Sequence, residues 1–151
     1  MVEIPAVVRN KALAAGASTW LDNLPGLVDE LEQEWALVVG PPFEGATEAY
    51  VPPASLSDGS SAVVKLLIPR AGDAARNEIT ALQLADGDGC VRLLRDDVSC
   101  GALLLERLGR SLHDVGLPVG QRYEILTAAA ARFWRPAPRQ MLAAADRLAS
   151  G

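Results

Sequence analysis

The apolar run from Ala62 to Ile68 contains one charged residue, Lys65, and Pro69 ends it. Its β-branched and aliphatic residues favour an extended strand. Because side chains alternate across a strand, Lys65 shares one face with Val63 and Leu67. Only two of the 14 cations in the chain are lysines, so arginine is the usual solvating cation here. A lysine within this strand therefore either points to water or is held by a carboxylate, since an unpaired buried ammonium is costly.

The segment after this strand offers such a carboxylate. Asp73 is suited to cap a helix that we expect to run to about Leu84. Glu78 falls within the apolar stripe of that helix, which Ala75, Ile79 and Leu82 form at the i, i+3, i+4, i+7 spacing. Spacing alone leaves two interpretations open. Either Lys65 and Glu78 form an ion pair, or both are edge residues that face water.

The periodicity of the remaining apolar residues predicts the other elements. We expect Asn23 to cap a helix with Pro25 in its first turn. The tryptophans Trp20, Trp35 and Trp134 are expected in the core. The remaining expected elements are a helix from Ile4 to Ala15, strands at Trp35 to Val39 and Ala49 to Val51, a turn from Ser55 to Ser61, strands at Val91 to Leu94 and Ala102 to Leu105, and helices at Gln121 to Phe133 and Gln140 to Leu148.

Composition limits the class of protein. A chain of 151 residues is about one domain. A net charge of −5 argues against nucleic acid and anionic membrane surfaces as partners, because both require a basic face. Two cysteines and one histidine are too few for a disulfide scaffold or a four-ligand zinc site. The N-terminus lacks a basic segment followed by an apolar one, so we expect a cytoplasmic protein with free, inert thiols at Cys90 and Cys100.

The loop from Gly40 to Thr47 has the glycine spacing of a phosphate-binding Walker A loop at Gly40 and Gly45. Ala46 stands where that motif requires lysine, and a strand follows where it requires a helix, so we reject a Walker A loop. Backbone N–H groups at Gly45 and Ala46 are still able to cover phosphates. An ordinary hairpin loop is the alternative.

These elements predict an α+β fold, with a five-stranded antiparallel sheet and one inserted helix in residues 35–108. An N-terminal helical segment (1–34) precedes it, and a linker with a helical tail (109–151) follows. The order of these strands and of the inserted helix along the chain resembles the N-lobe of a protein kinase. The amino-acid sequence resembles that of the aminoglycoside and hydroxyurea antibiotic-resistance kinases of the streptomycin 6-phosphotransferase type. The most specific matches are Gly87-Asp88-Gly89, Val91-Arg92-Leu93-Leu94 and Leu104-Leu105-Glu106-Arg107-Leu108.

The resemblance implies an ATP-dependent phosphotransferase that acts on an alcohol group, with Mg²⁺ as a second cofactor. In that scheme Lys65 contacts the α- and β-phosphates of ATP, and Glu78 holds Lys65 in place. The other implied nucleotide-binding residues are Gly45, Ala46 and Thr47 over the phosphates, Leu105 in the pocket wall, and Glu106 to Leu108 as a hinge, where the Glu106 carbonyl and the Leu108 N–H meet the adenine edge. The helical tail from Gln121 would begin the C-lobe.

The chain departs from this family in one respect. It has no His-Gly-Asp catalytic loop, and His113-Asp114 lies too early and lacks the glycine. We therefore expect the N-terminal part of such a kinase, with no catalytic residue or metal ligand of its own and no transfer by itself. An aminoglycoside acceptor would bind only with a C-lobe, and the exposed lobe underside would favour self-association. The alternatives are a non-catalytic nucleotide-binding or interaction module, and a cystatin-like or other α+β binding domain, which predicts no contact between Lys65 and Glu78.

Overall fold

The computed structural model describes residues 2–139 and has the expected α+β architecture. Its helices are α1 (Ala6–Ala14), α2 (Ser18–Trp35), α3 (Ala74–Ala85) and α4 (Val119–Phe133). Its strands are β1 (Leu37–Val39), β2 (Ala49–Tyr50), β3 (Pro53–Leu56), β4 (Ser61–Leu67), β5 (Leu93–Asp97) and β6 (Ala102–Glu106). The helix expected from Gln140 to Leu148 lies outside the described residues.

The sheet has six strands within the described residues and not the five expected. Its order is β1-β3-β4-β6-β5, and these strands pair antiparallel, as do β2 and β4. The additional strand is β3, whose last two residues, Ser55 and Leu56, fall in the segment predicted as a turn. Pro53 begins β3, where a missing N–H is tolerated. The Pro52 carbonyl accepts the Val64 N–H at 3.0 Å, so the backbone of β4 stays paired across the proline pair.

Strands β2 and β3 follow each other along the same edge of β4 and pair with it in one register. Ala49 pairs with Leu67 and Pro53 pairs with Val63, which is the same register on both sides of the interruption. The interruption therefore follows from Val51 and Pro52 and not from a change of direction. The strand expected at Ala49 to Val51 is present as β2, one residue shorter than expected, and β3 continues the pairing along β4.

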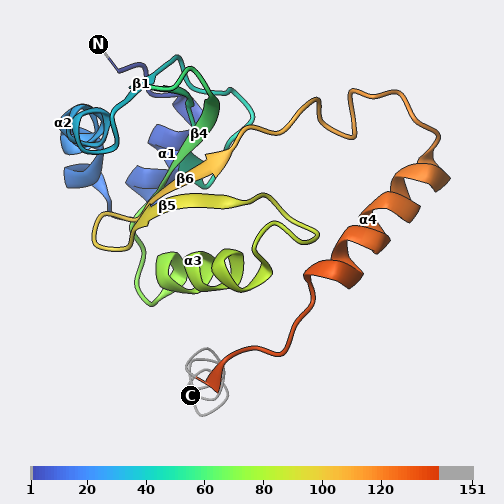
Figure 1. Cartoon of the computed structure of the whole chain (residues 1–151). Helices are drawn as coiled ribbons and strands as arrows, with labels where there is room; N and C mark the ends of the chain where they lie inside the picture. The colour runs from blue at the N-terminus through green and yellow to red at the C-terminus, as the bar shows by residue number, and fades with distance from the viewer. Residues whose placement is uncertain (1, 140–151) are drawn as a thin grey trace.

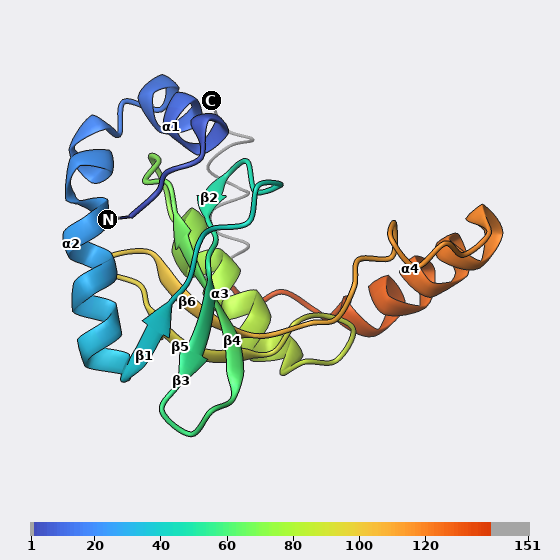
Figure 2. The same cartoon turned by 90° about the horizontal axis from the view of Figure 1, so that it is seen from above.

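The two faces of β4 pack against two different hydrophobic clusters. Ala62, Val64 and Leu66 are fully buried and belong to the core beneath α1 and α2. Val63 and Leu67, on the other face with Lys65, pack against a second cluster that includes residues of α3. Figure 1 shows α3 on one side of the sheet and α1 and α2 on the other, and Figure 2 shows the long α2 beside β1.

Helix α2 begins at Ser18, so the prediction of Asn23 as its N-cap is wrong, and Pro25 lies inside the helix. The buried stripe of α2 extends on both sides of the proline, from Leu21 to Trp35, and its burial outweighs the interior proline. None of the helices in residues 2–139 is long and apolar enough to cross a membrane.

Helix α4 lies apart from the three layers (Figure 1) and buries none of its residues. Trp134, which follows it, is 80% exposed, so its expected place in the core is wrong. Trp35 is buried and Trp20 packs partly buried against the α2 side of the core, as predicted. The difference arises because no residue of α4 packs into either core cluster of the described residues.

Candidate functional site

The predicted ion pair is present. The Lys65 Nζ donates to Glu78 Oε1 at 2.5 Å, and the two side chains are 27% and 32% exposed. Strand β4 directs Lys65 toward the α3 side because its neighbours Val64 and Leu66 fill the opposite core. Helix α3 returns Glu78 over that face. The contact contradicts the interpretation of the chain as an unrelated α+β binding domain, which required the two residues to be apart.

Half-buried aliphatic side chains surround Lys65 on its face of the sheet. Tyr50 and Ala54 are buried in the core beneath α2, so alternation places Val51 and Pro53 on the Lys65 face. Both are half-buried, as is Val63. The sheet thus presents an ammonium beside a strip of apolar surface, a combination that suits a ligand with an anionic end and a flat apolar end.

The predicted phosphate loop lies between β1 and β2. Gly45 has open space around it, and Thr47 is exposed, while Ala46 is half-buried. The loop is fastened at Glu48, whose carboxylate pairs with Lys11 at 3.0 Å and with Arg70. The Lys11 hydrogen bond, assisted by Arg70, lowers the pKa of Glu48 below its ordinary value of 4.5. The residues Gly45 to Thr47 have room above them, and their part in binding phosphate remains a prediction.

The predicted hinge residues follow the buried part of β6. Leu105 belongs to the cluster on the α3 side of the sheet. The Glu106 N–H donates to the Arg92 carbonyl at 3.0 Å, and the Glu106 carboxylate accepts the Arg92 N–H at 2.7 Å. Leu108 is 59% exposed. The Arg107 guanidinium lies 4.7 Å from the centre of the Phe43 ring, so the hinge segment meets the loop that follows β1.

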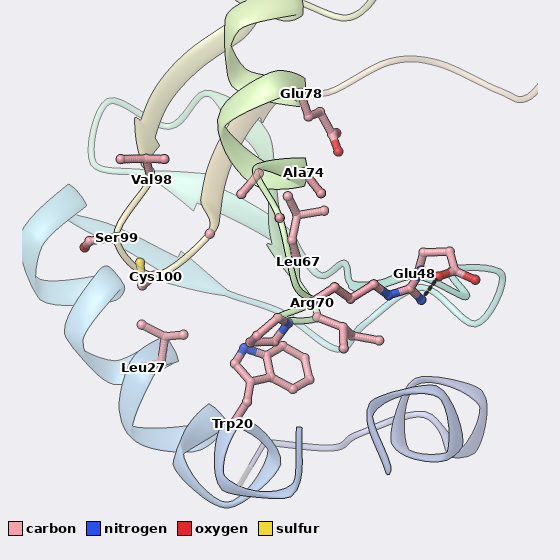
Figure 3. A pocket seen from close by; sticks show the side chains of 15 residues that line it. Trp20, Leu27, Glu48, Leu67, Arg70, Ala74, Glu78, Val98, Ser99 and Cys100 are labelled. Carbon is pink, nitrogen blue, oxygen red and sulfur yellow. Dashed lines mark hydrogen bonds and ion pairs between the residues drawn. The ribbon is translucent and has the colours of Figure 1, made fainter. Parts of the chain in front are cut away.

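A cavity of about 620 Å³ lies beside the ion pair and not around it. Glu78 lines it, and Lys65 does not (Figure 3). Its other walls come from Trp20 and Leu27 of α2, the start of α3, and the turn between β5 and β6 that carries Cys100. Burial, followed by the nearby Asp97, raises the pKa of the Cys100 thiol to about 11. This cavity therefore shares Glu78 with the predicted nucleotide contacts but includes none of the others.

Sequence reasoning missed Glu48 and Arg70, which line this cavity and pair with each other. Both are ordinary exposed charges in sequence, and only the pairing of β2 with β4 brings them together. His113 is exposed. Among residues 2–139 no three His, Cys, Asp or Glu side chains cluster closely enough to hold a metal ion.

Comparison with known proteins points to one family. The model of the aminoglycoside/hydroxyurea antibiotic resistance kinase family matches residues 34–149. A hydroxyurea phosphotransferase of Kitasatospora aureofaciens is 42% identical over 121 residues, which is 78% of this chain and 35% of that protein. A streptomycin 6-kinase of Streptomyces glaucescens is 37% identical over 114 residues, which is 74% of this chain and 36% of that protein. No solved structure matches the chain. The chain thus spans about a third of the length of these relatives.

Proposed function

Because the chain belongs to the aminoglycoside/hydroxyurea antibiotic resistance kinase family, we propose that it is the nucleotide-binding part of an ATP-dependent phosphotransferase that acts on an alcohol group. The α+β architecture, with its open antiparallel sheet and the helix α3, is consistent with a kinase N-lobe. In this proposal residues 35–108 bind ATP, residues 1–34 cover the outer face of the sheet, and α4 begins the second lobe.

The Lys65–Glu78 ion pair is the observation that carries the proposal. An ammonium has three donors, and Glu78 Oε1 accepts one of them. The other two are available to phosphate oxygens. Glu78 fixes the direction of a long, flexible side chain before the nucleotide arrives, which reduces the entropy lost on binding. Lys65 thus neutralises phosphate charge, and Glu78 positions Lys65.

The apolar strip beside Lys65 accommodates the purine in this proposal. Val51, Pro53 and Val63 form its floor, and Leu105 stands at its edge. The Glu106 carbonyl and the Leu108 N–H would bond the adenine edge, while backbone N–H groups of Gly45, Ala46 and Thr47 would cover the phosphates. The Arg107–Phe43 contact supports this arrangement because it brings the hinge and the loop to the same end of the sheet.

Transfer to an acceptor needs more than these residues. The chain has no His-Gly-Asp sequence to orient an acceptor hydroxyl, so we expect ATP binding without transfer from the chain alone. The names of the relatives suggest streptomycin or hydroxyurea as acceptors for the whole enzyme. Both are candidates for a complete protein in which this chain is the nucleotide lobe.

A fusion experiment tests the proposal. This chain would replace the matching third of the K. aureofaciens hydroxyurea phosphotransferase, and phosphate transfer from ATP to hydroxyurea and to streptomycin would be measured. We expect transfer to at least one acceptor, and its loss in the same fusion with Lys65→Met. A folded fusion that transfers phosphate equally well with Lys65→Met would contradict the assigned role of Lys65. A folded fusion that binds ATP but transfers to neither acceptor would favour a non-catalytic nucleotide-binding module.

A further inference from the structure

One arginine near the end of α4 and a second just after the helix converge on one carboxylate in the turn that follows α3. The Arg132 Nε lies 2.7 Å from Asp88 Oδ1, and an Arg135 terminal nitrogen lies 2.7 Å from Asp88 Oδ2. Each carboxylate oxygen therefore receives one guanidinium. A single ion pair that is this exposed to solvent contributes little to stability. A carboxylate that two arginines share forms a network with defined geometry.

The neighbouring Gly89 brings the same turn into contact with the α4 backbone. A Cβ at Gly89 would lie 2.4 Å from the Ala129 carbonyl oxygen and 2.7 Å from the Phe133 nitrogen. The φ of Gly89 is +78°, which side-chain-bearing residues rarely adopt. Both observations require glycine here. The chain after α4 then runs back toward α3 (Figure 1), where residues 133–138 face Ala81 and Leu84 across a small hollow.

The other side of this turn is fastened to α3 and, through Arg92, to the hinge. The Asp88 N–H donates to the Ala85 carbonyl at 2.8 Å, which joins the turn to the last turn of α3, the helix that carries Glu78. A Cβ at Gly87 would lie 3.1 Å from Arg92 Nε, so the Arg92 side chain packs directly on the turn. The backbone of Arg92 makes both hydrogen bonds to Glu106 described above.

We propose that the Gly87-Asp88-Gly89 turn couples α4 to the nucleotide site, with Asp88 and Gly89 as positioning residues. The turn connects α4 to α3, which places Glu78 against Lys65, and to Arg92, which places Glu106 at the hinge. A displacement of α4 therefore shifts the phosphate end and the adenine end of the site together. This inference rests on the proposed nucleotide-binding function, and it goes further by assigning α4 control over the site.

A pair of glycine substitutions separates this coupling from backbone strain. Gly89→Ala introduces a methyl group into α4 at a positive φ. The matched control Gly59→Ala has a φ of +82° and nothing within 4 Å of its Cβ, so it carries similar strain without touching α4. We expect Gly89→Ala to raise the Kd for ATP by about 2- to 30-fold, the range for residues that couple two sites, while Gly59→Ala leaves it unchanged. Calorimetric titration of the full chain with ATP measures both.

Two charge variants keep the test independent of any folding defect in Gly89→Ala. Asp88→Asn should weaken ATP binding, and Asp88→Arg combined with Arg132→Asp should recover part of the loss by restoring one ion pair. Hydrogen exchange across residues 119–133 should rise in Asp88→Asn and fall back in the double variant. Unchanged ATP affinity in both Gly89→Ala and Asp88→Asn would overturn the coupling. An unmodified chain that binds no ATP would instead contradict the proposed function, and the coupling with it.

Discussion

The ammonium of Lys65 and the carboxylate of Glu78 lie 2.5 Å apart although 13 positions separate them in the chain. Strand β4 and helix α3 bring them together, because the opposite face of β4 is committed to the core beneath α1 and α2. Both groups are partly withdrawn from water, with exposed fractions of 27% and 32%. Replacement of one partner alone therefore leaves the other charge partly withdrawn from water without its counterion.

Exchange of the two charges separates stability from function. Lys65→Glu or Glu78→Lys alone places like charges together, and each should lower the free energy of unfolding by about 1–3 kcal/mol. The double variant, which restores opposite charges, should be more stable than either single variant. It should still fail to bind ATP, because the ammonium then stands on α3 and a carboxylate faces the phosphates. Thermal unfolding and calorimetry measure these outcomes, and a double variant that binds ATP normally would contradict the role of Lys65.

The Lys11–Glu48–Arg70 cluster predicts a change in stability at acid pH. The pKa of Glu48 is lowered below 4.5 in the folded chain, first by the Lys11 hydrogen bond and then by Arg70. A carboxylate whose pKa is lower in the folded state than in the unfolded state stabilises the fold at any pH above its unfolded-state pKa. This stabilisation is lost as the pH falls through the folded-state pKa. The unmodified chain should therefore melt at a higher temperature than Glu48→Gln near neutral pH. This difference should disappear in acid.

Glu44→Gln is the control for this prediction, since it removes one charge from the same loop without touching the cluster. Higher salt should also reduce the Glu48→Gln effect at neutral pH, because the pairs are exposed. A Glu48→Gln effect of the same size from neutral to strongly acid pH would show that the cluster does not act through ionisation.

Cys100 is predicted to react slowly with thiol reagents. Burial raises its pKa to about 11, and only the thiolate is the reactive form. Its alkylation rate should therefore keep rising with pH well beyond about 8.5, where an ordinary thiol begins to level off. Mass spectrometry of peptides after timed iodoacetamide treatment measures this rate, and the chain unfolded in urea provides the reference. A native rate that levels off at the same pH as the unfolded rate would be the contrary result.

The exposed stripe of α4 predicts self-association with a second copy of the chain. Val119, Tyr123 and Leu126 share one helical face and are 58%, 67% and 55% exposed. Sedimentation should show a mass that rises above that of one chain as concentration increases. Leu126→Glu should reduce this rise, whereas Leu13→Glu, at a 54% exposed position of α1, should not. A single-chain mass at high concentration for the unmodified protein would exclude association through this face.

The ion pair was predictable because two simple periods identify its members. Alternation along β4 and the i, i+3, i+4 spacing of α3 each leave one charge in an apolar pattern, and a single buried face brings the two patterns together. The positions of most strands along the chain followed from the same periods. The pairing of the two residues was one of two interpretations that spacing left open, and the fold decides it.

Other features depend on contacts that local patterns do not contain. The strand β3 was missed because Pro52 and Pro53 indicate a break, although their carbonyls still accept the N–H groups of Val64 in β4 and of Gly40 just after β1. The start of α2 was placed too late because Pro25 usually begins a helix. The Asp88 contacts join charges that are 44 and 47 positions apart, and each of those residues looks like ordinary surface in sequence.

A comparison of the two lysines of the chain tests the central claim most directly. Calorimetric titration with ATP would be carried out on the unmodified chain, on Lys65→Met and on Lys11→Met, which removes the other lysine and its ion pair with Glu48. The account predicts that the unmodified chain and Lys11→Met bind ATP with similar Kd, while Lys65→Met shows no binding. Equal binding by Lys65→Met, or no binding by the unmodified chain, would contradict it.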